Sequence, residues 1–407
     1  MNSTIGQELR RGKPGRCNAA SPGKERDAVA DISDPARWRP EGCKRIALVL
    51  QGGGALGAYQ AGVYQALHEA GLDPDWLAGV SIGAINAALI AGNPRDRRVE
   101  RLRTFWERVT SRPVWGFSPQ GDLLRKAHTA AASLGAATFG QPGFFEPRSP
   151  TPWLLPRGAD GATSFYDSAP LRQTLLDLVD FDRLNDGEVR IGLGAVNVAT
   201  GNFAYFDTRD GRLGPEHVMA SGALPPALPP VPVGDALYWD GGIVSNTPLQ
   251  HLLDNIGQDD MLVFQVDLFS ARGVVPRDMM DTLGRDKDIR YSSRTRLTTD
   301  YYTALYHLKM RLRGLLARMP EERLTDEDRV LRRELSDLPS VNIIQLILQQ
   351  SVWEGQARDY DFSREAMLEH WDAGLRDTRL TLERPELLAM PGPDVGIVTH
   401  DVHRHRA

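Results

Sequence analysis

The chain of 407 residues is long enough for one large domain with an extension, or for two domains. Hydrophobic residues make up 41% of it and charged residues 25%, which is near the composition of ordinary globular proteins and excludes collagen-like, disordered and disulfide-framework classes. A formal net charge of −5 gives no general attraction to nucleic acid or to anionic lipid, so we predict no nucleic-acid partner.

The sequence predicts no metal and no cofactor. Cys17 and Cys43 lack the spacing of a metal or redox pair, and no acidic loop indicates calcium. Residues 1–42 contain no apolar run of the length that a signal peptide needs, and no later stretch reaches the ~18 apolar residues of a membrane span. We therefore expect a flexible N-terminal tail on a cytoplasmic protein, either freely soluble or peripheral at the inner membrane.

The first elements predict a parallel strand–helix–strand–helix unit. Residues 45–50 form an apolar run typical of a buried parallel strand, and residues 56–70 carry apolar side chains at helical spacing. Residues 76–80 predict a second strand, and the small residues of 82–91 predict a second helix. Two strands joined in this way lie parallel, with a right-handed crossover.

The rest of the chain predicts further strands and a helical C-terminal part. Residues 128–161, rich in Ala, Gly and Pro, predict a long excursion over the surface. Strands are predicted at 189–198, 203–207, 236–239, 261–268 and 341–348, and an amphipathic helix at 363–382. We divide the chain into a flexible tail (1–42), an α/β domain (43–270), a mainly helical extension (271–388) and a flexible end (389–407).

A basic helical segment follows residue 285. Between Arg285 and Arg318 there are 9 Lys or Arg against 3 Asp or Glu. Two interpretations stay open: the segment contacts anionic lipid headgroups, or its apolar stripe is buried and its arginines are solvated. The stripe consists of Tyr301, Leu305, Leu308, Leu312 and Leu315.

A glycine-flanked serine follows the second strand. Gly79-Val80-Ser81-Ile82-Gly83 fits the pattern GxSxG, in which the glycines permit a sharp strand-to-helix turn that exposes the serine hydroxyl above the sheet. Here an apolar strand precedes the serine and a helix of small residues follows it, as that turn requires. A buried turn serine in a glycine-rich loop is the alternative.

A glycine-rich loop follows the first strand and also allows two interpretations. Gly52-Gly53-Gly54-Ala55-Leu56-Gly57 fits the dinucleotide pattern GxGxxG, but the next strand ends at Ser81 and not at the acid that would hold a ribose. In an acyl-transfer site, the backbone N–H groups of Gly53 and Gly54 would bind a developing oxyanion. Neighbouring parallel strands end at one sheet edge, so this loop and Ser81 should meet.

Asp240-Gly241-Gly242 follows a third strand. An aspartate at a strand end, with two glycines that allow close backbone approach, can accept a proton from a nearby serine. Asp-Gly-Gly is also a common turn. The motif alone does not show whether Asp240 accepts a proton or only forms a turn.

The three motifs together, in this order, resemble the patatin-like phospholipase family. Ala220-Ser221 before Pro225-Pro226, and Asn246 with Pro248 after the aspartate, are also similar to that family. The resemblance runs from about residue 45 to 268 and implies an α/β fold in three layers, with a mostly parallel central sheet flanked by helices. The segment around Tyr360 and Trp371 is similar to an extension found in some bacterial members.

The resemblance implies a lipid acyl hydrolase that needs no metal. Ser81 would be the nucleophile and Asp240 the base, with the loop of Gly52, Gly53, Gly54 and Gly57 forming the oxyanion hole. Gly79, Gly83, Gly241 and Gly242 would shape the two turns. An acyl ester lipid is the implied substrate, with peripheral contact to a membrane or lipid droplet, and the oligomeric state stays open. The arginine that often follows the glycine loop is replaced by Ala58, which leaves the headgroup preference open.

Two other functions stay open. A Ser-His-Asp α/β-hydrolase shares GxSxG but needs a histidine after the acid, and His251 is the available candidate. A catalytically silent lipid-binding protein of the same fold is the second alternative. If the substrate is a lipid, the aromatic part of the excursion, residues 139–153, either covers the site or packs on the surface.

Overall fold

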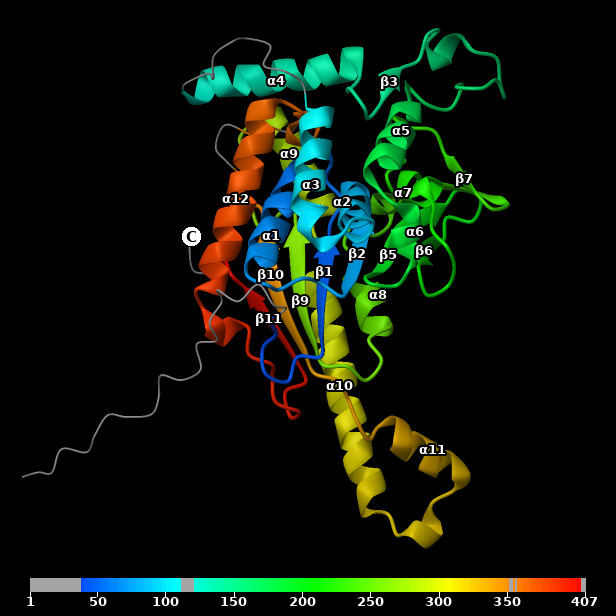
Figure 1. The fold of residues 1–407 in the computed structure, drawn as a ribbon, viewed down its shortest axis with the longest axis vertical. Coiled ribbons are helices and arrows are strands. Elements are labelled where there is room, and N and C mark those ends of the chain that lie inside the picture. Colours follow the sequence, from blue (N-terminus) through cyan, green and yellow to red (C-terminus); the bar gives the residue numbers. More distant parts are fainter. Residues whose placement is uncertain (1–37, 111–120, 351–353, 356, 404–407) are drawn as a thin grey trace, which may run out of the picture.

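A nine-stranded mixed sheet runs through the part of the chain that the computed structural model describes, which is residues 38–110, 121–350, 354–355 and 357–403 (Figure 1). The strand order is β11-β10-β9-β1-β2-β5-β8-β7, and β6 pairs with β5 off this path. The strands are β1 (Arg45–Leu50), β2 (Trp76–Val80), β5 (Arg190–Asn197), β6 (Phe203–Asp207), β7 (Val231–Val233), β8 (Ala236–Asp240), β9 (Met261–Asp267), β10 (Val341–Ile347) and β11 (Ile397–Asp401). A separate two-stranded ribbon contains β3 (Glu146–Pro147) and β4 (Tyr166–Asp167).

The six strands from β11 to β5 are parallel, and β6, β7 and β8 form an antiparallel margin. The apolar runs of the sequence become the central strands because a parallel strand with helices on both faces is buried throughout. Every residue of β2 and of β9 is buried, for example. All the strands predicted from the sequence are confirmed, within one or two residues at their ends.

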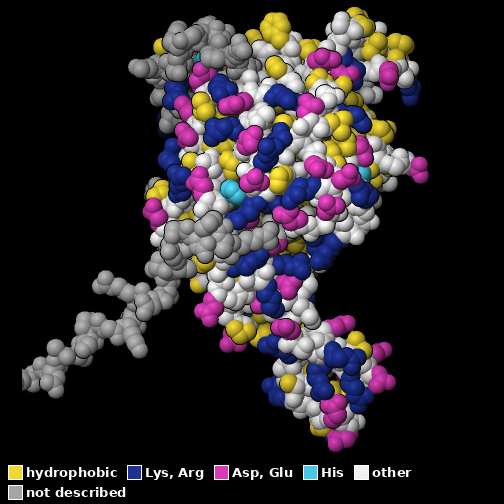
Figure 2. All heavy atoms as spheres, in the orientation of Figure 1, with side chains coloured by type: hydrophobic (Ala, Val, Ile, Leu, Met, Phe, Trp, Pro, Cys, Tyr) yellow, Lys and Arg dark blue, Asp and Glu magenta, His cyan; other side chains and the backbone are white. Residues whose placement is uncertain are grey.

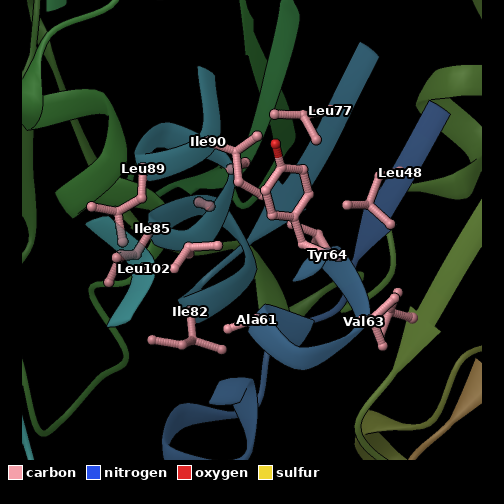
Figure 3. Close-up of a cluster of buried hydrophobic side chains, with 14 of the residues drawn as sticks. Leu48, Ala61, Val63, Tyr64, Leu77, Ile82, Ile85, Leu89, Ile90 and Leu102 are labelled. Atoms are coloured by element: carbon pink, nitrogen blue, oxygen red, sulfur yellow. The ribbon is translucent and has the colours of Figure 1, made fainter. Parts of the chain in front are cut away.

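Side chains of β1 alternate between two separate cores. Leu48 belongs to a large core with helices α1 (Ala58–Glu69), α2 (Ile82–Ala91) and α3 (Arg98–Val109), part of which is drawn in Figure 3. Val49 points to the other face, where it joins a smaller core with α8 (Leu249–Asp254) and with Tyr302 of α10 (Thr295–Arg318). Helices on both faces make three layers, which confirms the predicted fold class.

The C-terminal part of the chain completes this architecture. Helix α12 (Arg364–Leu382) lies along α1, and the two helices cross where each has a glycine. A Cβ at Gly62 would collide with the carbonyl of Trp371, and one at Gly374 with the carbonyl of Tyr59. The close crossing fixes α12 on the main α/β body.

Two strands of the C-terminal part enter the central sheet. β10 pairs with β9, and β11 pairs with β10. The extension is therefore not helical alone, although it supplies α9 (Met279–Tyr291), α10, α11 (Asp326–Glu334) and α12. The prediction of a flexible end from residue 389 is wrong as far as His403, because β11 is hydrogen-bonded into the sheet. The domain boundary at 270 stays a prediction, and the expected tail lies outside the described residues except for 38–42.

The basic segment forms two helices, since α9 ends at Tyr291 and α10 begins at Thr295. Helix α10 continues beyond the sheet and, with α11, forms an arm at the opposite end of the molecule from α4 (Asp122–Phe139). The apolar stripe of α10 is divided, so neither interpretation holds along its whole length: Tyr301, Leu308 and Leu315 are exposed, whereas Leu305 and Leu312 are half-buried. Leu312 packs against a small core of Leu316, Leu324 and Leu335. The arm projects from the body, and its own small core joins α10 to α11.

The excursion predicted at 128–161 is partly regular, since α4 occupies its first third. Its aromatic residues divide into two groups. Phe144 and Phe145 pack against Phe362 of the C-terminal part, while Phe139 and Trp153 are 81% and 83% exposed. Figure 2 shows hydrophobic side chains at this upper margin of the molecule, whereas charges of both signs mix over the remainder of the visible face. Among the described helices, none combines the length and apolar composition needed to cross a bilayer.

Candidate active site

Ser81 lies at a sharp turn between β2 and α2. Its φ of 57° is the one positive value among the non-glycine residues that the structure describes. An L-residue adopts this conformation at a cost in backbone energy, and such strain persists only where neighbouring contacts enforce it. The predicted turn is thus present, with the serine as its apex.

Ser221, the last residue of α7 (Pro215–Ser221), holds this turn in place. The backbone N–H of Ser81 donates to the carbonyl and to the Oγ of Ser221, both at 3.1 Å. The Ser221 hydroxyl in turn donates to the carbonyl of Gly194 in β5 at 2.6 Å. A fully buried serine therefore links the turn to the neighbouring strand.

The pairing of β5 brings Asp240 to the same place. Residues 192–196 of β5 pair with β6, so β6 occupies one edge of β5 and both β2 and β8 occupy the other. Val80 of β2 lies opposite Gly194, and Asp240 of β8 lies opposite Ala195. The carboxyl ends of β2 and β8 therefore meet at consecutive residues of one strand, although β8 enters from the opposite direction.

The glycine loop closes around this point. Asn246 holds the loop, because its Nδ2 donates to the carbonyl of Gly52 at 3.0 Å and its own carbonyl accepts the N–H of Gly52 at 3.2 Å. Gly54 has a φ of 55°, and a Cβ there would collide with the carbonyl of Asp359. Within the described residues, the N–H groups of Gly53 and Gly54 have no protein acceptor, and both glycines line a pocket with Ser81.

Steric crowding explains the other glycines of the three motifs. A Cβ at Gly57 would lie 2.5 Å from the side chain of Ile82, and one at Gly79 would lie 2.5 Å from the carbonyl of Gly83. A Cβ at Gly83 would collide with the carbonyl of Leu50, one at Gly241 would lie 2.6 Å from the carbonyl of Gly194, and one at Gly242 would lie 2.9 Å from Asn246 Oδ1. Any side chain at these positions would push the turns apart.

Burial raises the pKa of Asp240 to about 6, because its carboxylate lies away from water. Two hydrogen bonds oppose this effect by stabilising the charged form: one from the Ser81 hydroxyl and one from the N–H of Gly242 at 2.7 Å. The carboxylate is thus less acidic than an ordinary aspartate and is in contact with the serine hydroxyl.

A pocket of about 170 Å³ contains these groups and has two chemically different sides. Six of the predicted site residues line it: Gly52, Gly53, Gly54, Ser81, Asp240 and Gly242. One side is apolar and is formed by α2, α4, the aromatic residues before β3 and the turn after α7, with Ile82, Ile85, Ala137, Phe144, Phe145, Leu224 and Leu228. The other side is formed by α9 and the short helix Arg358–Tyr360, with Lys287, Tyr291, Asp359 and Tyr360.

The residues of this second side were not predicted from the sequence as site residues. Lys287 and Tyr291 belong to a segment identified only by its basic charge, and Asp359 and Tyr360 to a segment whose role was left open. The backbone of Asp359 packs directly on the glycine loop, because a Cβ at Gly54 would collide with the Asp359 carbonyl. Nothing in the sequence spacing indicates this contact.

The histidine weighed for a Ser-His-Asp arrangement lies elsewhere. His251 is buried on α8, where its Nε2 is 2.9 Å from Asp207 Oδ2 and its ring stacks on Tyr205. His68 on α1 lies 2.9 Å from Asp73. No histidine is among the described residues that line the pocket, and no described group of three or more His, Cys, Asp or Glu is placed to hold a metal ion.

Comparison with known protein families shows to which family this chain is related. A sequence model of the patatin-like phospholipase family matches residues 48–253. The chain belongs to the patatin-like phospholipase family. A second model, described as patatin phospholipase, matches residues 289–394, so the part that supplies α10, β10 and α12 of this patatin-like protein also has relatives with that description.

Curated relatives of the patatin-like chain are larger proteins. It is 26% identical over 244 residues to lysophospholipase nte1 of Aspergillus terreus, a match that covers 59% of this chain and 13% of the relative. It is 48% identical over 79 residues to neuropathy target esterase sws of Drosophila melanogaster, covering 19% and 5%. Among solved structures, VipD from Legionella pneumophila matches with 14% identity, 89% of this chain, 72% of that chain and a TM-score of 0.32, which is too low to compare the two in detail.

Proposed function

We propose that the chain is a serine-dependent lipid acyl hydrolase in which Ser81 is the nucleophile and Asp240 the only other catalytic side chain. One observation carries the proposal: the ends of β2 and β8 meet on β5, so that a strained serine and a buried carboxylate occupy one pocket. The lysophospholipase and esterase names of the relatives support the same reaction class.

The reaction begins when Ser81 Oγ attacks the carbonyl carbon of an ester and its proton passes to Asp240. The carbonyl oxygen becomes an oxyanion, which the N–H groups of Gly53 and Gly54 stabilise at the start of the helical turn Gly54–Gly57. When the intermediate collapses, the bond to the alkoxy oxygen breaks and Asp240 returns the proton to the leaving alcohol. The acyl group stays on Ser81 as an ester.

Hydrolysis of this acyl-enzyme repeats the same steps with water. Asp240 takes a proton from the water, whose oxygen attacks the acyl carbon, and then returns it to Ser81 Oγ as the carboxylic acid leaves. A base with a pKa of about 6 is largely ionised at pH 7 and is stronger than an ordinary aspartate. The raised pKa therefore suits Asp240 to both half-reactions.

The apolar side of the pocket is the place for the acyl chain. Ile82 and Ile85 lie one and four residues after the nucleophile on α2, and Phe144 and Phe145 close the pocket from the excursion. Phe139, at the end of the helix that supplies Ala137 to this side, and Trp153 are both exposed, which supports peripheral contact with a membrane or droplet through the margin that carries them. A lipid could then leave the bilayer and enter the pocket directly.

A fluorophosphonate probe tests the nucleophile. We expect it to label the native protein and the Trp153→Ser variant, and to leave Ser81→Ala unlabelled. A panel of phospholipid, lysophospholipid, triacylglycerol and p-nitrophenyl esters then identifies the ester class, with Ser81→Ala and Asp240→Asn as inactive controls. Labelling that persists in Ser81→Ala would refute the assignment, and so would a native protein that neither reacts with the probe nor hydrolyses any ester.

A histidine-dependent mechanism makes the opposite prediction. His251 already contacts Asp207 and does not line the pocket. We expect His251→Asn to keep probe labelling and ester hydrolysis within a few-fold of the native protein. A loss of labelling in a folded His251→Asn variant would favour the Ser-His-Asp scheme.

A further inference from the structure

An ion pair lies in the wall of the pocket. Lys287 Nζ of α9 is 2.7 Å from Asp359 Oδ1, and both residues line the same cavity as Ser81. Their side chains are 25% and 14% exposed, so the pair is partly withdrawn from solvent but open to the cavity. The aromatic ring of Tyr360 lies 5.2 Å from the Lys287 ammonium.

Both partners of this pair are held in place relative to the glycine loop. The carbonyl of Tyr291, one turn after Lys287, accepts hydrogen bonds from Asn246 Nδ2 at 2.9 Å and from Gln51 Nε2 at 3.0 Å. Asp359 lies against Gly54, where there is no room for a Cβ. The positive and the negative group therefore occupy defined positions beside the groups that would act on the ester.

A second ion pair already ties the same two elements together. Asp288 and Arg358, the chain neighbours of Lys287 and Asp359, are 8% and 6% exposed and hydrogen-bonded to each other. Neither of them lines the pocket. The Asp288–Arg358 pair thus joins α9 to the short helix, and neither of its charges lies at the cavity.

Building on the hydrolase function proposed above, we propose that Lys287 and Asp359 form a headgroup subsite for a zwitterionic phosphodiester. The Lys287 ammonium binds the phosphate, and Asp359 binds the ammonium of the headgroup, which lies against the rings of Tyr360 and Tyr291. A lysine donates charge-assisted hydrogen bonds to phosphate oxygens, and aromatic faces attract alkylammonium groups. The substrate class is accordingly a phospholipid or lysophospholipid whose head carries both charges.

The choice of a zwitterion follows from the charges of the pair. A lysine alone would favour any anionic head, but Asp359 repels a phosphate that brings no positive charge of its own. A neutral glyceride would leave both charges without a new partner. Ser81, the apolar residues and this ion pair line one pocket, so the acyl chain and the phosphate head of one ester can each reach a matching part of its wall.

Ligand binding to a Ser81→Ala background tests the subsite without any turnover. The two ligands are dodecylphosphocholine, below its micelle concentration, and an anionic dodecyl phosphodiester that lacks the ammonium. We expect Lys287→Met to weaken dodecylphosphocholine binding about ten- to a hundredfold, the usual loss for a hydrogen bond to a charged group. Lys287→Arg keeps the charge and should stay within a few-fold.

Asp359→Asn should weaken dodecylphosphocholine and strengthen the anionic ligand, so that the order of preference changes. Asp288→Asn is the matched control, because it breaks the neighbouring ion pair between the same elements. We expect it to leave the ratio of the two dissociation constants unchanged. Equal weakening by Lys287→Met and Asp288→Asn would overturn the proposal, as would an Asp359→Asn variant that shifts both ligands by the same factor.

These outcomes are separate from those of the hydrolase test. A native protein that binds dodecylphosphocholine through Lys287 but neither hydrolyses esters nor reacts with a fluorophosphonate would retain the subsite and lose the hydrolase function. A protein that hydrolyses esters, with no effect of Lys287→Met on binding, would retain the hydrolase function and lose the subsite.

Discussion

Replacing Asp240 by asparagine should abolish activity and stabilise the fold. The carboxylate is buried, and its pKa of about 6 lies above the ordinary 3.8 because its charged form is poorly solvated. Keeping the group ionised at pH 7 therefore costs the folded state roughly 3 kcal/mol, from 1.36 kcal/mol for each unit of pKa difference. Asparagine has nearly the same shape, carries no charge and can still accept the N–H of Gly242 through its carbonyl oxygen.

The sign of the pH dependence follows from the raised pKa. The contribution of Asp240 to stability is most favourable below its unfolded pKa and is lost as the pH rises through about 6. Wild type and Asp240→Asn should thus have similar stability near pH 4 and diverge above it, with the variant more stable by up to about 3 kcal/mol at pH 7. Burial also raises the pKa of Asp267 to about 6, but that group titrates in both proteins and cancels in the difference.

Two measurements check this prediction. Urea unfolding of both proteins between pH 4 and 8 gives the difference in the free energy of unfolding, and p-nitrophenyl ester hydrolysis gives kcat/KM. A base with a pKa of about 6 is about 9% ionised at pH 5 and about 91% at pH 7, so wild-type kcat/KM should rise about tenfold. The reasoning is wrong if Asp240→Asn is the less stable protein at pH 7, or if wild-type activity is flat between pH 5 and 7.

Three further predictions concern the turn, the loop and the exposed margin. Ser221→Ala removes the hydroxyl that links Ser81 to Gly194. We expect the free energy of unfolding to fall by about 1–3 kcal/mol and kcat to fall with little change in KM. A change in KM alone would contradict this. Gly54→Ala would place a side chain at a positive φ and against the carbonyl of Asp359. We expect kcat to fall by a hundredfold or more, while the circular dichroism spectrum shows that the fold is retained. Native-like turnover would contradict the oxyanion role. Phe139→Ser with Trp153→Ser should reduce hydrolysis of micellar substrate more than of monomeric ester, whereas Leu315→Ser, an exposed apolar residue on the arm, should affect neither. Equal loss on both substrates would exclude the margin as a lipid contact.

The sequence predicted the central strands because they are short apolar runs that end at glycine, proline or aspartate. β1 and β2 were found with their ends correct, since a parallel strand buried on both faces needs such a run. Helix α4 was missed because its Ala-rich sequence lies inside a Gly- and Pro-rich region and has no clear apolar stripe. β11 was missed because its residues are only partly buried at the sheet edge, which permits a polar sequence.

The site was predictable only in part, for a physical reason. Ser81, Asp240 and the glycine loop each follow a strand, and strands with known neighbours place their ends together. Lys287 and Asp359 follow no such rule, because a helix outside the sheet and a loop near α12 bring them to the pocket. The two interpretations of the α10 stripe could not be separated from the sequence, because periodicity identifies an apolar face but not whether anything covers it.

The shared pairing of β2 and β8 on β5 has a mechanical consequence. Adjacent residues in one strand are separated by a fixed rise of about 3.3 Å, and hydrogen-bonded ladders deform little under thermal motion. Helix α4 and the aromatic excursion line the same pocket but lie outside this ladder. Substitutions in α4 or in the excursion can therefore change the lining of the pocket without moving the ends of β2 and β8.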